Sequence, residues 1–495
     1  MASSGAPASA STFTSTNPAT GEVVGTFPVH TSEDAQRAVE RARIAARWWG
    51  AIGFAERRRR LMAFKAILAR RSEELCAVVR AENGKSDDDA FIEVLLSVLH
   101  LDWAARHARR TLAPHRVRPG LLMLNQKATI RYAPVGVVGV IGPWNYPVFT
   151  PMGAIAYALA AGNAVVFKPS ELTPAVSVWL VDAFAAVVPE HQVLQLLTGA
   201  ADTGAALCRS GVDKLVFTGS ARVGRAVMAT CADTLTPVVM ECGGNDAMIV
   251  DDDADLDAAA TAAVWGGLQN TGQACISVER VYVTDAVHDR FVERVADLAG
   301  AVREADVPRP QLGPMTSSAQ IAAIEGHLTD ALARGARAVV GGPAAIRPPY
   351  VNPVVLVDVP ADARIMQEET FGPILPIARV RDADEAVRRA STSDNLGTSV
   401  FARRAGADIA RRLRAGMTSV NAVAVFAAVP ALPWGGQGES GFGRIHGEEG
   451  LMEFVRPHAI TEQRFDLPVD MMSFGRPEWL IGVLDRAMKL RHGRG

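Results

Sequence analysis

The sequence has almost no net charge, because 51 lysines and arginines are matched by 53 aspartates and glutamates. This balance excludes the basic field of a nucleic-acid-binding chain, so no nucleic-acid partner is expected. Only five cysteines occur in 495 residues, and none belongs to a Cys-x-x-Cys pair. Neither a disulfide framework nor a cysteine zinc site is therefore indicated, and a reducing, cytoplasmic setting is expected.

The sequence also predicts no targeting segment. The first 13 residues contain no charge, whereas a secretory signal needs a basic start and a transit peptide needs arginines. We interpret residues 1–13 as a disordered lead-in. Another uncharged stretch, residues 132–167, is interrupted by glycines and prolines, so it does not fit a spanning helix of about 20 residues.

That uncharged stretch is better explained as strand 135–142, turn 143–147, helix 151–162 and strand 163–168. Wholly apolar strands are typical of a parallel sheet that is covered on both faces. Similar strands over 214–220 and 247–253 alternate with amphipathic helices such as 32–49 and 285–302. The pattern predicts a doubly wound α/β fold, and the length predicts two to four interleaved domains without internal repeats.

Three polar residues stand where a catalytic group would be useful. Cys275 lies in the flexible, polar segment NTGQACISVER, which suits a nucleophilic thiol, although most single cysteines are inert core residues. Glu241 ends an apolar strand before two glycines, where burial would raise its pKa towards that of a general base, unless it is solvated. Asn145 stands between two prolines in PWNYP and is either an oxyanion donor or a turn residue.

Two segments favour nucleotide binding. In KLVFTGSARVG a strand leads through Gly219 and Ser220 into a helix whose first amides would bind a pyrophosphate, although a GxGxxG fingerprint is absent. Lys168, one of only six lysines, follows another strand with Glu171, and both could bind ribose hydroxyls or be solvated. No HExxH, GxSxG or Walker A pattern occurs, and no metal site is expected. The acidic runs 87–89 and 251–253 are interpreted as charges at helix N-termini.

Eight segments in one order make the sequence resemble the NAD(P)-dependent aldehyde dehydrogenase superfamily over roughly residues 15–465. They are NPATGE (17–22), PWNYP (143–147), KPSE (168–171), FTGSARVG (217–224), ECGG (241–244), GQAC (272–275), EETFGP (368–373) and PWGGQGESGFGR (433–444). Endings such as ISVER and SGFGRIHGEEGL are similar to the subgroup that includes actinobacterial succinate-semialdehyde and long-chain aldehyde dehydrogenases.

The resemblance implies a Rossmann-type cofactor domain (1–115 and 135–243), an α/β catalytic domain (244–438) and a small oligomerisation sheet (116–134 and 456–468). A homodimer or homotetramer would be usual for such a chain. Residues 469–495 form a C-terminal tail beyond the usual end. The tail predicts a basic amphipathic helix, which would pack on a partner subunit or lie weakly on a membrane surface.

The resemblance also assigns roles. Cys275 would attack the aldehyde to form a thiohemiacetal and then a thioester, Asn145 would hold the oxyanion, and Glu241 would activate water. The expected cofactor contacts are Ile141, Gly142, Trp144, Lys168, Ser170, Glu171, Gly219, Ser220, Glu369 and Phe371. Glu171 would repel a 2′-phosphate, so NAD is favoured and NADP is the alternative.

The substrate is expected to be an apolar aliphatic or aromatic aldehyde. Gly153 replaces the bulky aromatic of many relatives, which suggests a wide tunnel, and Tyr146, Phe426 and Trp434 would supply its walls. No arginine flanks Asn145 or Cys275 to bind a carboxylate, although the subgroup resemblance favours succinate semialdehyde. An acylating dehydrogenase would tend to lack Glu241, and a catalytically silent binding protein is the remaining alternative.

Overall fold

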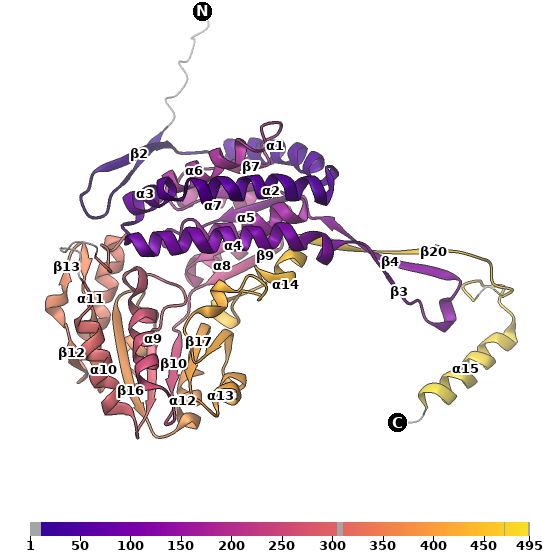
Figure 1. Cartoon of the computed structure of the whole chain (residues 1–495). Helices are drawn as coiled ribbons and strands as arrows, with labels where there is room; N and C mark the ends of the chain where they lie inside the picture. Colours follow the sequence, from indigo (N-terminus) through magenta and orange to yellow (C-terminus); the bar gives the residue numbers. More distant parts are fainter. Residues whose placement is uncertain (1–10, 304–309, 470, 494–495) are drawn as a thin grey trace, which may run out of the picture. The chain divides into compact units, whose positions relative to one another are not determined.

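The structure is a computed structural model that describes residues 11–303, 310–469 and 471–493. It divides into two compact units, the first containing residues up to 111 together with 134–455, and the second containing 112–133 and the chain from 456. Figure 1 shows two lobes in the first unit, each built on one sheet.

The first sheet has six strands in the order β19-β9-β8-β5-β6-β7, all parallel except β19. Their bounds are Val137–Ile141 (β5), Ala164–Lys168 (β6), Leu194–Leu196 (β7), Lys214–Gly219 (β8), Val238–Cys242 (β9) and Gly441–Phe442 (β19). The helices of this lobe are Ser32–Ala51 (α1), Gly53–Arg70 (α2), Ser72–Asn83 (α3), Asp87–Leu112 (α4), Phe149–Ala161 (α5), Pro174–Ala185 (α6), Ala201–Arg209 (α7), Ala221–Ala232 (α8) and Gly447–Met452 (α14). Every residue of β5 and β6 is buried, because helices cover both faces.

The second sheet has seven strands in the order β12-β15-β16-β11-β10-β17-β18. They are Arg337–Val340 (β12), Val354–Val357 (β15), Ile374–Val380 (β16), Arg280–Thr284 (β11), Ala247–Val250 (β10), Asn395–Phe401 (β17) and Ala415–Val420 (β18). Its helices are Leu256–Leu268 (α9), His288–Gly300 (α10), Ser318–Ala333 (α11), Ala383–Ala390 (α12) and Gly406–Arg412 (α13). Met248 and Ile249 enter two different core clusters, as expected for neighbouring residues of a strand that is buried on both faces.

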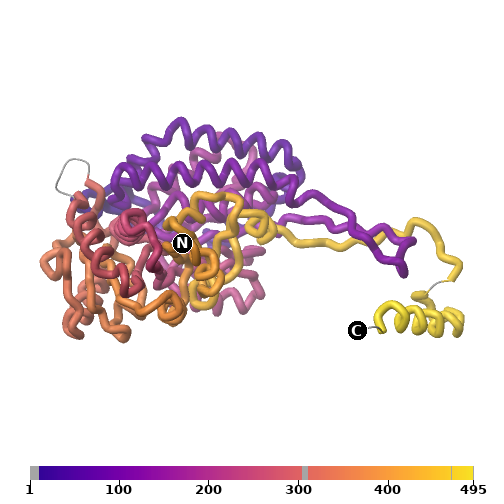
Figure 2. Tube along the Cα trace, turned by 60° about the horizontal axis from the view of Figure 1, so that its bottom comes forward, coloured from indigo at the N-terminus to yellow at the C-terminus, as the bar shows by residue number. Residues whose placement is uncertain are grey.

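The second unit contains a three-stranded sheet in the order β20-β4-β3. Its strands are His115–Val117 (β3), Gln126–Pro134 (β4) and Val455–Gln463 (β20), and Figure 2 shows β4 and β20 side by side although they are far apart in the sequence. The predicted tail helix is present as α15 (Glu478–His492), and most of its side chains are exposed.

The predicted lead-in is wrong at its end. Residues Thr12–Thr16 form strand β1, which pairs with β2 (Val23–Pro28), so Thr12 and Phe13 are held by backbone hydrogen bonds. Residues 1–10 of the lead-in and Arg494 of the basic tail lie outside the described residues. Among the described helices, none combines the length and the apolar character that a membrane crossing requires.

Candidate active site

Cys275, Asn145 and Glu241 come from three loops or strand ends that meet beside one cavity. Cys275 follows a short 3-10 turn (η2, Gln269–Gly272) after α9, Asn145 lies in the turn between β5 and α5, and Glu241 lies near the end of β9. Cys275 lines a cavity of about 210 Å³. Trp434 lines the same cavity and donates a hydrogen bond to Glu241 Oε2 at 2.6 Å.

The amide of Asn145 is held against the loop that carries the cysteine. Its Nδ2 atom donates to the carbonyl oxygen of Gln273 at 3.0 Å, and Asn270 Nδ2 donates to the carbonyl oxygen of Asn145 at 3.1 Å. An amide nitrogen carries two donor hydrogens. The second N–H of Asn145 therefore suits an oxyanion that forms next to Cys275.

The cysteine loop adopts an uncommon backbone conformation. Asn270 and Thr271 have φ angles of 49° and 57°, and Gly272 follows with 72°. A left-handed residue other than glycine costs about 1–2 kcal/mol. Here the Asn270 N–H is bound by Asp89, at 3.1 Å, and the Thr271 hydroxyl by the carbonyl oxygen of Gly313, at 3.0 Å. Strain held in this way is frequent at functional sites, and it fixes the approach to Cys275.

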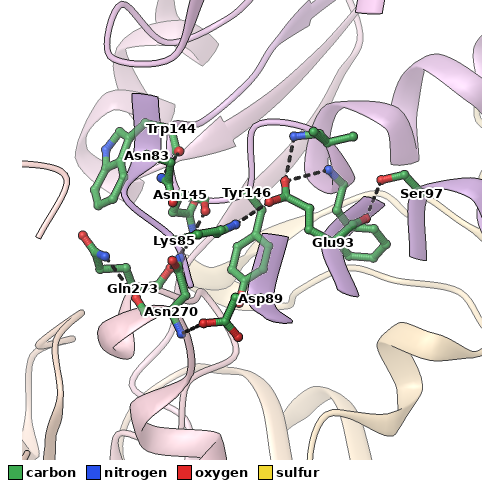
Figure 3. Close-up of polar contacts among 12 residues, drawn as sticks. Asn83, Lys85, Asp89, Glu93, Ser97, Trp144, Asn145, Tyr146, Asn270 and Gln273 are labelled. Atoms are coloured by element: carbon green, nitrogen blue, oxygen red, sulfur yellow. Dashed lines mark hydrogen bonds and ion pairs between the residues drawn. The ribbon is translucent and has the colours of Figure 1, made fainter. Parts of the chain in front are cut away.

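A buried ion pair fixes the turn that carries Asn145, as Figure 3 shows. The side chains of Lys85 and Glu93 are wholly buried and bonded to each other. Glu93 Oε1 also accepts from the backbone N–H groups of Val148 and Phe149, at 2.7 and 3.0 Å, where α5 begins. Lys85 Nζ lies 3.6 Å from the centre of the Tyr146 ring. The ion pair therefore positions both ends of the segment that follows Asn145.

This ion pair and the role of Asp89 were not predicted from the sequence. Asp89 does lie in the first turn of α4, as predicted, but its carboxylate binds the cysteine loop rather than only the helix end. One signal was available for Glu93, which interrupts the apolar segment AFIEVLLSVL of α4. A carboxylate within an apolar helix segment usually has a buried partner.

Burial governs the protonation of the candidate catalytic groups. Burial, together with the carboxyl groups of Glu241 and Glu369, raises the pKa of the Cys275 thiol well above its usual value. Burial also raises the pKa of Glu241 to about 8, although the hydrogen bond from Trp434 opposes this change. The thiol is therefore protonated at neutral pH, and Glu241 becomes an effective base as the pH rises.

We expect the rate of a reaction that needs the Glu241 carboxylate to rise with pH around this pKa. Trp434→Phe removes a hydrogen bond that stabilises the carboxylate, so the pKa of Glu241 should rise. The ascending limb of the pH profile of kcat should therefore move to higher pH by about one unit or more. The measurement is the pH profile of kcat for the wild type and the variant. Trp265→Phe, in the same cavity, is the matched control, and an unmoved limb in Trp434→Phe would contradict the assignment.

The expected cofactor residues gather at the carboxyl ends of adjacent parallel strands. Ile141 and Lys168 end β5 and β6 and are paired in the sheet, and the Gly142 N–H donates to the carbonyl of Lys168 at 3.0 Å. Gly219 ends β8, and Ser220 caps α8 by accepting from the Val223 N–H. Ligands of open α/β sheets bind at such strand ends.

Lys168 ends β6 at this edge of the sheet, and Ser170 and Glu171 follow it in the loop. Lys168 Nζ lies 3.6 Å from Glu171, whose side chain is 47% exposed, and burial lowers the pKa of the Lys168 ammonium. Ser170 Oγ accepts from the backbone N–H of Leu172. The ammonium and the exposed carboxylate are close enough to bind one ribose together.

Trp144 of the turn between β5 and α5 contacts the segment that carries Glu369 and Phe371. The Trp144 and Phe371 rings meet edge-on with centres 5.6 Å apart. Glu369 Oε1 is buried without a hydrogen-bond partner, and a side chain at Gly243 would overlap that carboxylate. A buried acceptor without a partner fits a ligand hydroxyl, and the nicotinamide ribose expected from the resemblance would supply one.

The structure places two of the four expected pocket residues on the cavity wall. Tyr146 and Trp434 line the cavity. Phe426 lies behind the wall and packs on Trp434, with ring centres 6.0 Å apart. Gly153 does not widen the cavity as expected, because α5 turns it towards His446, whose Nε2 would be 2.6 Å from an added Cβ.

Comparisons with known proteins show the family of this chain. The family model described as "Aldehyde dehydrogenase family" matches residues 6–460. The chain is 36% identical to a 4,4'-diapolycopene aldehyde oxidase of Methylomonas, covering 94% of this chain and 88% of that protein. It is also 36% identical to an NADP succinate-semialdehyde dehydrogenase of Deinococcus radiodurans, covering 90% and 94%.

Solved structures show the same fold. A putative aldehyde dehydrogenase from Burkholderia cenocepacia superposes with a TM-score of 0.89 at 31% identity, covering 94% of this chain and 96% of that one. An NAD-dependent aldehyde dehydrogenase from Sinorhizobium meliloti gives 0.87 at 33% identity, covering 94% and 93%. The predicted α/β fold and superfamily are confirmed: the chain belongs to the aldehyde dehydrogenase family.

Proposed function

We propose that this chain oxidises an apolar aldehyde to the carboxylic acid, with Cys275 as the nucleophile. The observation that carries the proposal is the meeting of Cys275, the Asn145 amide and the Glu241 carboxyl beside one apolar cavity. The sulfur bonds to the carbonyl carbon as the thiol proton passes to a water molecule. The carbonyl oxygen becomes an oxyanion that accepts a hydrogen bond from Asn145, which gives a thiohemiacetal.

The second half of the reaction releases the acid. When bound, NAD supplies the hydride acceptor, and loss of hydride from the carbon leaves a thioester on Cys275. Glu241 takes a proton from water as the water oxygen attacks the thioester carbon. The carbon–sulfur bond then breaks, the thiol recovers a proton, and the carboxylic acid leaves.

The cavity wall supports an apolar substrate. Of its lining residues, within the described part of the chain, none is lysine or arginine, and Asp89 is the one with a carboxyl group. The wall is otherwise mainly apolar, with Ile92, Leu96, Phe149 and Val423 among its members. A carboxylate on the substrate would be desolvated here without a cationic partner. The alternative, succinate semialdehyde, is favoured by the name of the Deinococcus relative.

A panel of aldehydes tests the choice of substrate. We expect kcat/KM for octanal and benzaldehyde to exceed that for succinate semialdehyde, measured as NADH formation under identical conditions. A tenfold preference for succinate semialdehyde would contradict the apolar proposal and would leave the chemistry of Cys275 unchanged. Failure of the wild type to oxidise any member would favour a binding protein on the same fold.

NAD is proposed as the preferred cofactor, with NADP as the alternative. Lys168 and Glu171 would hold the adenosine ribose, and a 2′-phosphate on that ribose would meet the Glu171 carboxylate. Glu171→Gln removes this repulsion, so the kcat/KM ratio of NADP to NAD should rise about fivefold to tenfold. Equal or better kcat/KM with NADP in the wild type would refute the preference, and Glu74→Gln, at an exposed position of α3, serves as control.

We also propose a role for each domain and an assembly of identical subunits. We place the cofactor in residues 1–115 and 135–243, the catalytic cysteine in 244–438 and subunit association in the sheet of 116–134 and 456–468. In β20 every residue after Val455 is exposed, and no residue of β4 is fully buried. A second copy of the chain would cover these strands, which supports a homodimer or homotetramer.

A further inference from the structure

A second cavity, of about 470 Å³, adjoins the cavity that contains Cys275. It is bounded by the start of α4, from the lobe of the first sheet, and by α9 and the end of α10, from the lobe of the second sheet. Four residues line both cavities, namely Asp89, Ile92, Trp265 and Gln269. The two spaces are therefore neighbours on either side of these side chains.

The second cavity has an apolar floor. Val264, Leu268 and Leu312 line it and are at most 8% exposed, and Leu298 and Val302 are partly buried in its wall. Three of its polar members, Asp88, Thr261 and Gln311, are exposed at the rim. An exposed groove with an apolar floor favours an apolar ligand whose ends reach water.

The boundary between the two cavities is compatible with an apolar chain. Ile92 and Trp265 are 39% and 43% exposed, so neither is locked within the core. The Oδ2 atom of Asp89 accepts hydrogen bonds from the Asn270 N–H and the Ser86 hydroxyl. One oxygen of this carboxylate is therefore bound to the cysteine loop. The apolar side chains of Ile92 and Trp265 thus provide the contact surface between the two spaces.

The first cavity alone is small. A cavity of about 150 Å³ holds a benzene molecule, so 210 Å³ accepts an aromatic ring or a short aliphatic chain beside Cys275. We propose that the second cavity is a distal subsite that binds the far end of a long alkyl or polyene chain whose aldehyde group lies at Cys275. This inference rests on the proposed function, because it assumes that an aldehyde carbon is bound at Cys275.

The test fills the second cavity without touching the first. Thr261 lines only the second cavity and is exposed on α9, so Thr261→Trp should fold and occupy the groove. Ala301→Trp fills the same groove from the end of α10. The matched control is Ala258→Trp, one turn earlier on α9, exposed and outside both cavities. The measurement is kcat/KM for dodecanal and for hexanal in each protein.

The expected result is a fall of about tenfold in the dodecanal-to-hexanal ratio of kcat/KM in both filling variants and no fall in the control. Each methylene that leaves an apolar site costs about fourfold in affinity, so a displaced chain end accounts for this change. An unchanged ratio in both filling variants would overturn the subsite although the proposed function still holds. A wild type that oxidises neither aldehyde would overturn the proposed function and the subsite together.

Discussion

Replacing Glu241 with glutamine is expected to leave the first turnover of an aldehyde intact and to slow every later turnover. Glutamine retains an oxygen that can accept from the Trp434 indole, so the geometry of the site is kept while the base is lost. A positioned general base contributes about 10²–10⁴-fold, and kcat should fall by that factor. The thioester on Cys275 would then accumulate.

Rapid-mixing measurement of NADH checks this expectation. The variant should release close to one NADH per active site in a burst, followed by a slow steady state, because hydride loss precedes hydrolysis. Glu73→Gln, an exposed glutamate in the first turn of α3, is the control and should behave as the wild type does. If the burst disappears together with the steady state, Glu241 acts before hydride loss and our assignment is wrong.

Breaking the buried ion pair is expected to cause the largest loss of stability. Lys85→Met leaves the Glu93 carboxylate buried without its cation, and loss of one partner of such a pair costs about 3–5 kcal/mol. Lys85→Met/Glu93→Gln should recover much of this loss, because glutamine is neutral and its oxygen still accepts from the N–H groups of Val148 and Phe149. The measurement is the midpoint of thermal and denaturant unfolding in the three proteins.

A surface pair provides the comparison for this prediction. Arg71 and Glu74 are about half exposed, so Arg71→Met should cost at most about 1 kcal/mol. Lys85→Met should also lower kcat by a larger factor than the factor by which it changes KM for NAD. The reason is that the ion pair positions the turn of Asn145 and not the strand ends around Lys168. A Lys85→Met protein as stable as Arg71→Met would contradict the structural role of the pair.

The residues that could be predicted from the sequence are those whose signal is local. Runs of apolar residues predicted β5, β6, β8 and β10, and periodicity predicted α1 and α10, because burial imposes these patterns on neighbouring residues. Thr12 and Phe13 were predicted as disordered, since the pairing of their strand with Val23–Pro28 depends on a partner strand and not on local composition. The aldehyde dehydrogenase motifs likewise predicted Cys275, Asn145 and Glu241 as the catalytic residues.

The residues that could not be predicted act across long sequence distances. Asp89 binds Asn270, 181 positions away, and nothing in the acidic run distinguishes it from its neighbours. Gly153 was expected in the cavity, but its environment depends on His446, which lies in a different segment. Phe426 was expected on the wall and lies one layer behind it. Such placements depend on tertiary packing, which a single sequence does not encode locally.

We propose that Cys275 carries the acyl group of the substrate during turnover. The most direct measurement is peptide mass spectrometry of the Glu241→Gln protein after mixing with octanal and NAD. We predict an octanoyl group on the peptide that contains Cys275 and unmodified peptides for the other four cysteines, which are buried and do not line the cavity. An unmodified Cys275 in a protein that has released NADH would contradict the account.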